Sequence, residues 1–190
     1  MDDGGDSDET LIERYARGDV RAFESLYERH EMRVWRYLVR NVGNRETADE
    51  LLQEVWFAVA RDAQRYQPSS RFTTWLFTIA HNRMIDAIRA RRPHVSLETL
   101  GLDSEPVVEQ LTSDPGSGPL AAAVARDHSR AILQAVGQLP ADQRNAFLMQ
   151  VEGDLSVEEI AAITRSSFET TKSRLRYART KLRELLTEFA

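Results

Sequence analysis

The sequence has 190 residues, a net charge of −5 and no cysteine. This length suits one or two domains with their own cores, and the lack of cysteine excludes disulfides, cysteine-ligated zinc and thiol catalysis. The 25 basic and 30 acidic residues are unevenly spread, whereas a protein that coats DNA non-specifically needs a broad cationic surface. We therefore expect weak DNA binding by the chain alone, or DNA binding within a larger complex.

The sequence contains no pattern for a metal site or a membrane segment. The first nine residues are acidic and lack the basic and apolar regions of a signal peptide. No later apolar run approaches the roughly 20 residues of a membrane span. The histidines form no HExxH pair and no close cluster; they are His30, His81, His94 and His128. These features predict a cytoplasmic protein with no metal, no cofactor and no membrane insertion.

The chain begins with an acidic tail and a short helix, together residues 1–18. Asp19 then caps a helix whose apolar residues recur at helical spacing up to Gly43, and Asn44 caps the next helix. Between the apolar positions of that helix lies an exposed acidic and amide set, namely Asp49, Glu50, Gln53 and Glu54. Periodicity alone does not distinguish this set from an ordinary solvated face.

A loop with Pro68 and two serines leads into a helix from about Thr73 to Arg92. Aromatic residues at the loop end, followed by amide and basic residues, suit a surface that stacks on unpaired bases and holds the phosphate backbone. The residues of this surface are Phe72, Trp75, Asn82, Arg89, Arg91 and Arg92. The residues alone do not decide whether Phe72 and Trp75 belong to this surface or to the core.

Pro93 ends this first helical domain, which covers residues 19–92. Residues 93–119 are rich in proline, glycine, serine and acids and lack a helical period, which predicts a flexible acidic linker. Residues 120–190 predict a second helical domain. The core residues expected ahead of its last two helices are Ile132, Val136, Leu139, Phe147, Leu148 and Val151.

The second domain is predicted to end in two helices that meet at a tight corner. Ser156, three residues before Glu159, makes a capping box for the first helix, and Leu175 lies in the apolar stripe of the second. Such a pair fits the DNA major groove with the second helix as the reader. The alternative is an amphipathic hairpin with a solvated basic face. The polar residues at the corner and on the exposed side are Arg165, Ser167, Glu169, Thr170, Ser173 and Arg176.

In order and spacing, five blocks of the chain resemble a bacterial RNA polymerase sigma factor of the extracytoplasmic-function (ECF) group. The resemblance covers nearly all of Ala22 to Leu186, and its blocks are AFESLYERH, ADELLQEVW, FTTWLFTIAHNRMIDAIRARR, LPADQRNAFLMQVEGDLSVEEIA and KSRLRYARTKLREL. It implies an all-α protein of two small helical domains, the second ending in a helix-turn-helix. It also implies core RNA polymerase, promoter DNA and an anti-sigma factor as partners.

The resemblance implies a role for each candidate surface. The acidic and amide set would bind the coiled coil of the largest polymerase subunit. The segment from Tyr66 to Trp75, with Asn82 and Arg83, would open the downstream (−10) promoter element and capture a flipped base. The residues that would read the upstream (−35) element are Lys172, Ser173 and Arg176, although on a helical wheel Lys172 lies nearer the buried stripe.

Three positions of the helix-turn-helix depart from the family pattern. Arg165 stands where glycine is usual, Glu169 where a small residue is usual, and Thr171 where a branched apolar residue is usual. Arg165 would adopt an altered turn or contact phosphate, and Glu169 would accept a hydrogen bond from a cytosine amino group. These departures concern the recognised upstream sequence more than the fold.

The sequence therefore predicts a promoter-recognition subunit and not an enzyme. The main alternative is a stand-alone helix-turn-helix regulator, which the acidic linker and the second, aromatic-rich DNA surface disfavour. A nuclease built on His81, Asn82, Arg83 and Asp86 is a more distant alternative, because no partner carboxylate cluster or metal spacing accompanies them.

Overall fold

The structure, a computed structural model, describes residues 5–91 and 129–187. Every regular element in these two ranges is helical, which confirms the all-α prediction. The predicted linker at residues 93–119, the start of the second domain and Arg92 lie outside the described residues.

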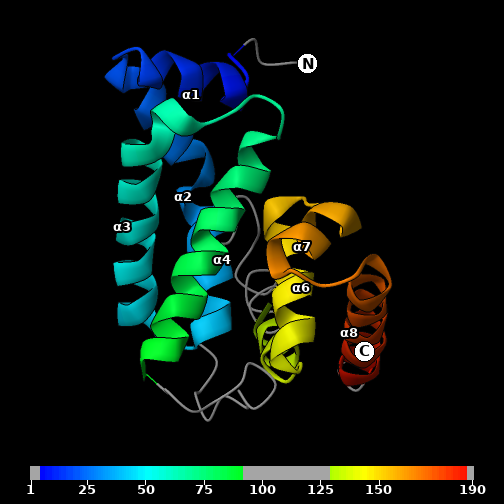
Figure 1. The fold of residues 1–190 in the computed structure, drawn as a ribbon. Coiled ribbons are helices and arrows are strands. Elements are labelled where there is room, and N and C mark those ends of the chain that lie inside the picture. Colours follow the sequence, from blue (N-terminus) through cyan, green and yellow to red (C-terminus); the bar gives the residue numbers. More distant parts are fainter. Residues whose placement is uncertain (1–4, 92–128, 188–190) are drawn as a thin grey trace, which may run out of the picture.

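The first domain is a bundle of three long helices with a short helix across one end (Figure 1). α2, α3 and α4 pack against one another, and α1 contacts α2, α4 and the short 3₁₀ helix η1. The elements are α1 (Asp8–Ala16), α2 (Val20–Val42), α3 (Arg45–Asp62), η1 (Ala63–Arg65) and α4 (Phe72–Arg91). The fully buried side chains at the centre of this bundle include Leu26, Tyr37, Leu38, Leu76 and Phe77.

Local caps set the limits of the first three helices. The side chains of Ser7, Asp19 and Asn44 accept hydrogen bonds from main-chain N–H groups at the starts of α1, α2 and α3. Gly43 ends α2 in the left-handed conformation, with φ of 68°. A residue with a side chain would be strained there, so this glycine separates α2 from α3.

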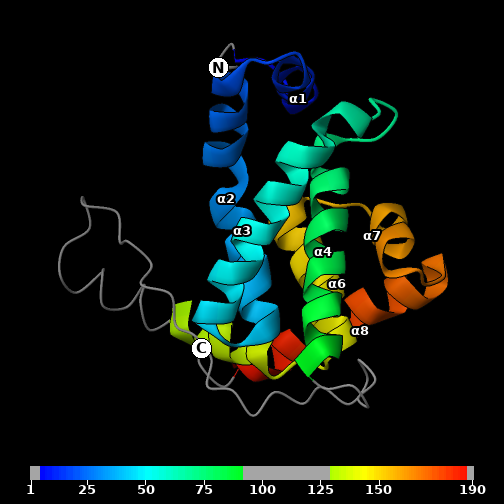
Figure 2. The same ribbon diagram turned by 60° about the vertical axis from the view of Figure 1, so that its left-hand side comes forward.

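The second domain contains a helical segment at residues 129–137 followed by three helices (Figure 2). These are α6 (Ala141–Gly153), α7 (Val157–Thr164) and α8 (Phe168–Thr187). The predicted capping box is present at the start of α7, because Glu159 N donates to Ser156 Oγ at 3.2 Å and Ser156 N donates to Glu159 Oε2 at 2.8 Å. Leu148, Ile160 and Leu175 lie in the core.

Two expected core residues of this domain are exposed. Ile132 is 48% exposed and Val151 is 53% exposed, so both expectations were wrong. On α6, the side that carries Asn145 and Glu152 is buried instead, because these two residues bond to the first domain. Val151 is the neighbour of Glu152, about 100° around the helix, and it faces solvent.

The two domains pack against each other through α2 and α4 on one side and α6 and α7 on the other (Figure 1). Glu152 is only 4% exposed, and its carboxylate accepts hydrogen bonds from Arg40 and, at 3.0 Å, from Arg36 Nε. The buried Tyr37 hydroxyl donates to Asn145 Oδ1 at 2.8 Å. Polar groups thus join the two domains inside a buried contact.

His81 belongs to the same contact. Its Nδ1 lies 3.2 Å from the Tyr37 hydroxyl oxygen. Burial, aided by the positive charges of Arg165 and Arg89, lowers the pKa of His81 to about 4, so the imidazole is neutral at pH 7. Burial also raises the pKa of Tyr37 well above its ordinary value, which keeps its hydroxyl a donor.

Candidate polymerase-binding and DNA-binding surfaces

The predicted acidic and amide set lies together on the solvent side of α3. All four of its members are exposed, while Leu51, Val55 and Trp56 face the core. Asp49 is also held in place, because Trp35 Nε1 donates to its Oδ1 at 2.6 Å. The arrangement is an acidic ridge on a rigid helix, available to a partner that carries positive charge.

One residue beside this ridge was missed by sequence reasoning. Phe57 is 72% exposed and follows Gln53 by four residues, so it lies on the same side of α3. A helical wheel starting from Glu50 and Gln53 would have found it. The ridge therefore offers a partner an apolar contact beside its acidic and amide groups.

The predicted −10 surface on α4 divides into a core part and an exposed part. Phe72 is fully buried, with its ring centroid 5.5 Å from His30 and 6.0 Å from Trp75. Its ring therefore belongs to the core and not to a stacking surface. Trp75 is half-buried against Tyr66, at 5.3 Å between ring centroids, and keeps part of its surface open.

The polar residues further along α4 remain accessible. Asn82 and Arg89 are exposed, and Arg83 is half-buried. Asn82 and Arg89 are seven residues apart and so lie on one side of the helix. The side chain of Arg91 and all of Arg92 lie outside the described side chains. The amide group of Asn82 and the guanidinium groups of Arg83 and Arg89 are therefore open to solvent along α4.

Hydroxyl groups fix the corner of the helix-turn-helix. Arg165 occupies the left-handed region with φ of 52°, a conformation that favours glycine. Ser166 Oγ lies 2.9 Å from Thr164 Oγ1 and 2.7 Å from Thr171 Oγ1. Ser167 caps α8 by accepting a hydrogen bond from Thr170 N at 3.1 Å. Arg165 thus keeps the left-handed conformation that glycine favours at this place, so the altered turn, one of its two predicted roles, is not observed.

α8, the predicted reading helix, presents most of its candidate residues to solvent. Glu169, Thr170, Lys172 and Arg176 are exposed, and Ser173 is half-buried. Lys172 lies on the solvent side despite its place on the helical wheel. The Arg176 guanidinium stacks on the exposed ring of Tyr177, 4.9 Å from its centroid, which holds the cation near the helix surface.

A helix with accessible amide and basic groups in one domain and a helix-turn-helix in the other define a DNA-binding protein with two separate contact regions. The sequence matches the Sigma-70 region 2 family over residues 26–94 and the Sigma-70 region 4 family over residues 129–182. The first match covers most of α2 and all of α3 and α4, and the second covers α6, α7 and most of α8.

Curated relatives give the particular family. The chain is 38% identical over 179 residues to the RNA polymerase sigma factor CarQ of Myxococcus xanthus, covering 93% of this chain and 96% of CarQ. It is 27% identical over 179 residues to the ECF RNA polymerase sigma factor SigW of Bacillus subtilis (strain 168), covering 93% and 95%. The chain belongs to the ECF sigma factors.

Solved structures agree with this fold. The sigma factor RpoE in complex with the anti-sigma factor NepR from Bartonella quintana aligns with a TM-score of 0.67 at 25% identity, over 87% of this chain and 96% of RpoE. CnrH in complex with the cytosolic domain of CnrY aligns with a TM-score of 0.65 at 23% identity, over 97% and 100%. At 23% identity, the similarity to CnrH concerns the fold alone.

As a sigma factor, the protein recognises promoters and initiates transcription with RNA polymerase, and it is not an enzyme. Within the described ranges, no helix is long and apolar enough to span a membrane. Among the same residues, no group of three or more acidic or histidine side chains is placed to hold a metal ion.

Proposed function

We propose that the ridge on α3 is the polymerase-binding surface, with Glu50 and Gln53 at its centre. The support is physical: exposed acidic and amide groups stand on a helix whose other side is fixed in the core, so they are preorganised for a basic partner. Phe57 adds a side chain that exposes apolar surface to water in the free protein and would bury it on binding. This preorganised ridge is the observation that carries the proposal.

The experiment is a charge reversal with a matched control. Glu50→Lys combined with Gln53→Ala should abolish co-purification with core polymerase and leave helicity and melting temperature nearly unchanged, because both side chains are exposed. Glu24→Lys combined with Gln64→Ala makes the same changes at exposed positions of α2 and η1 and should retain binding. Normal co-purification of the first variant would reject the assignment.

We propose that the two DNA surfaces divide the promoter between them. Asn82, Arg83 and Arg89, with Trp75 at the loop end, would hold the opened −10 element, where an amide can pair with an extruded base. Arg91 and Arg92 would extend this surface toward phosphates. Phe72 would support it from the core. The position of Asn82 and Arg89 on one accessible side of α4 supports this division.

The −35 element would lie along the N-terminal half of α8. Lys172, Ser173 and Arg176 are the proposed base-reading residues, and Glu169 and Thr170 stand beside them on the same helix. Arg165 and Ser167 at the corner would contact the phosphate backbone, where a cation and a helix N-terminus both favour an anion. Glu169 would then select cytosine through its amino group.

We also propose an anti-sigma factor as a regulatory partner and the cytoplasm as the site of action. In the Bartonella quintana structure, RpoE, a sigma factor of the same fold, is in complex with the anti-sigma factor NepR. Since polymerase and promoter DNA are the functional partners, the protein must act where both are present.

A further inference from the structure

The N-terminus of α4 has no acceptor close to it in the sequence. Trp75 N donates to Arg71 O at 3.2 Å, so Arg71 is the residue at the cap position. An arginine side chain has only donors and cannot cap a helix. Its guanidinium instead donates to Asp154 O at 3.0 Å in the second domain. The first N–H groups of α4 therefore require an acceptor from elsewhere.

Glu9 of α1 supplies this acceptor. Phe72 N, at the start of α4, donates to Glu9 Oε1 at 2.9 Å, although the two residues are 63 positions apart in the sequence. A carboxylate at this place also interacts favourably with the positive end of the helix dipole. The start of the helix that carries Asn82 is thus set by a residue of α1.

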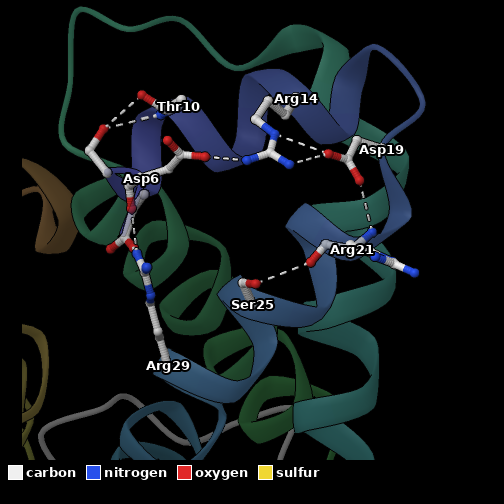
Figure 3. A network of polar contacts seen from close by, with 9 residues as sticks. Asp6, Thr10, Arg14, Asp19, Arg21, Ser25 and Arg29 are labelled. Carbon is white, nitrogen blue, oxygen red and sulfur yellow. Dashed lines mark hydrogen bonds and ion pairs between the residues drawn. The ribbon is translucent and has the colours of Figure 1, made fainter. Parts of the chain in front are cut away.

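α1 is in turn held on α2, so that its first turn is a rigid support. Asp8 Oδ2 lies 2.6 Å from His30 Nε2, and Arg29 donates to Asp8 Oδ1 at 3.0 Å. Burial opposes ionisation of Asp8, yet the contacts with His30 and Arg29 lower its pKa. Figure 3 shows the outer part of this network, in which Arg14 bonds both Asp6 and Asp19.

The loop before α4 is closed by a hydrogen bond of its own and is tied to α1 and α2 where it ends. Within the loop, the Tyr66 hydroxyl donates to Ser70 O at 2.5 Å. Burial, aided by the negative charges of Glu9, Glu13 and Asp8, raises the pKa of Tyr66 to about 12, so the phenol keeps its proton. At its end, Phe72 is bonded to Glu9 through its N–H and packs on His30 through its ring.

We propose that Glu9 is a positioning residue for −10 strand capture: by capping α4 from α1, it fixes the loop at residues 66–71 and the direction of the helix that presents Asn82. This rests on the proposed role of that loop and helix in opening the promoter. In this proposal α1 helps to open the strands, although none of its residues is proposed to contact DNA.

The test uses Glu9→Ala, Glu9→Gln and the control Glu13→Ala in holoenzyme reconstituted with core polymerase. Glu13 is on the same helix but pairs with Arg17, the residue that follows α1, at 3.2 Å, and not with α4. The probe is a single-stranded oligonucleotide with the non-template −10 sequence of a promoter identified by mapping transcript starts. A second readout, in the free protein, is hydrogen exchange of the Phe72 amide.

Glu9→Ala should speed exchange of the Phe72 amide and weaken oligonucleotide binding, each about fivefold, as expected for loss of one cap. Core polymerase binding should not change. Glu9→Gln should restore both, because the amide oxygen accepts the same hydrogen bond, and Glu13→Ala should match the wild type. A purely structural role would lower polymerase and oligonucleotide binding in parallel and would overturn the proposal.

Two further outcomes would also overturn it: unchanged exchange in Glu9→Ala, or faster exchange with unchanged oligonucleotide binding. A different result would show that α4 does not bind the −10 element at all. In that case the wild-type holoenzyme itself would not bind the oligonucleotide, or Asn82→Ala would bind it normally, whereas exchange of the Phe72 amide would still report the cap.

Discussion

Glu152→Gln should loosen the contact between the two domains. Its carboxylate, 5% exposed as a side chain, faces Arg36 and Arg40, which are 29% and 18% exposed. Hydrogen bonds to charged groups contribute about 1.5–3 kcal/mol, and breaking a fully buried pair costs about 3–5 kcal/mol. Because both arginines reach solvent, we expect a loss of about 1–3 kcal/mol, which corresponds to a shift toward separated domains of roughly fivefold to 150-fold.

Single-molecule energy transfer can measure this shift, because the chain contains no cysteine and two introduced cysteines would be labelled selectively. Suitable exposed positions are Gln64 in η1 and Lys181 in α8. Asp154→Asn is the matched control, since Asp154 is 80% exposed and lies 3.5 Å from Arg71. Such an exposed pair contributes little, so this variant should behave like the wild type.

Equal distributions of transfer efficiencies in Glu152→Gln and Asp154→Asn would refute this role of Glu152. The contact between the two domains matters for function because the two promoter elements lie far apart on the DNA. The −35 and −10 elements are about 25 base pairs apart, or roughly 85 Å at about 3.4 Å per base pair. α4 packs directly on α7 in this structure. If the two proposed surfaces each bind one element, the domains would therefore have to separate before both elements are bound.

Three further results are expected. Asn82→Ala should spare binding to closed duplex but reduce permanganate reactivity of unpaired thymines. A pre-melted bubble template should restore open-complex formation only in part. Unchanged strand opening would remove Asn82 from the site. Arg176→Ala should lose about 1–3 kcal/mol of promoter binding, measured by competition, and relax preference at one upstream position; an equal loss on all sequences would indicate a phosphate contact. Because the pKa of His81 is lowered from 6.5 to about 4, its stabilising effect should be complete above pH 6.5 and fall as pH falls toward 4. His81→Gln should flatten this part of the pH–stability curve in thermal denaturation, and an unchanged curve would contradict the assignment.

Helix positions and the capping box could be predicted because they depend on neighbours in the sequence. Ser156 and Glu159 are three residues apart, and their mutual hydrogen bonds need no other part of the chain. The exposure of Glu50 and Gln53 followed from helical spacing in the same way.

The role of Phe72 could not be predicted in this way. An aromatic residue beside a loop looks the same whether it faces DNA or the core, and its burial depends on His30 from another helix. Likewise, the acceptor for its N–H is Glu9, far away in the sequence. Contacts of this kind arise only when the helices pack, so periodicity carries no information about them.

The departures from the family pattern at the helix-turn-helix corner are physically connected. A residue other than glycine in the left-handed region costs roughly 1–2 kcal/mol, which Arg165 must offset. A threonine at position 171 keeps the branched shape that a core position needs, and its hydroxyl bonds Ser166, which in turn bonds Thr164. Since hydrogen bonds typically contribute about 0.5–1.5 kcal/mol each, the two contacts can balance the strain at Arg165. The corner thus keeps its geometry without glycine, and the added cation stands beside the start of the reading helix, where DNA phosphate would pass.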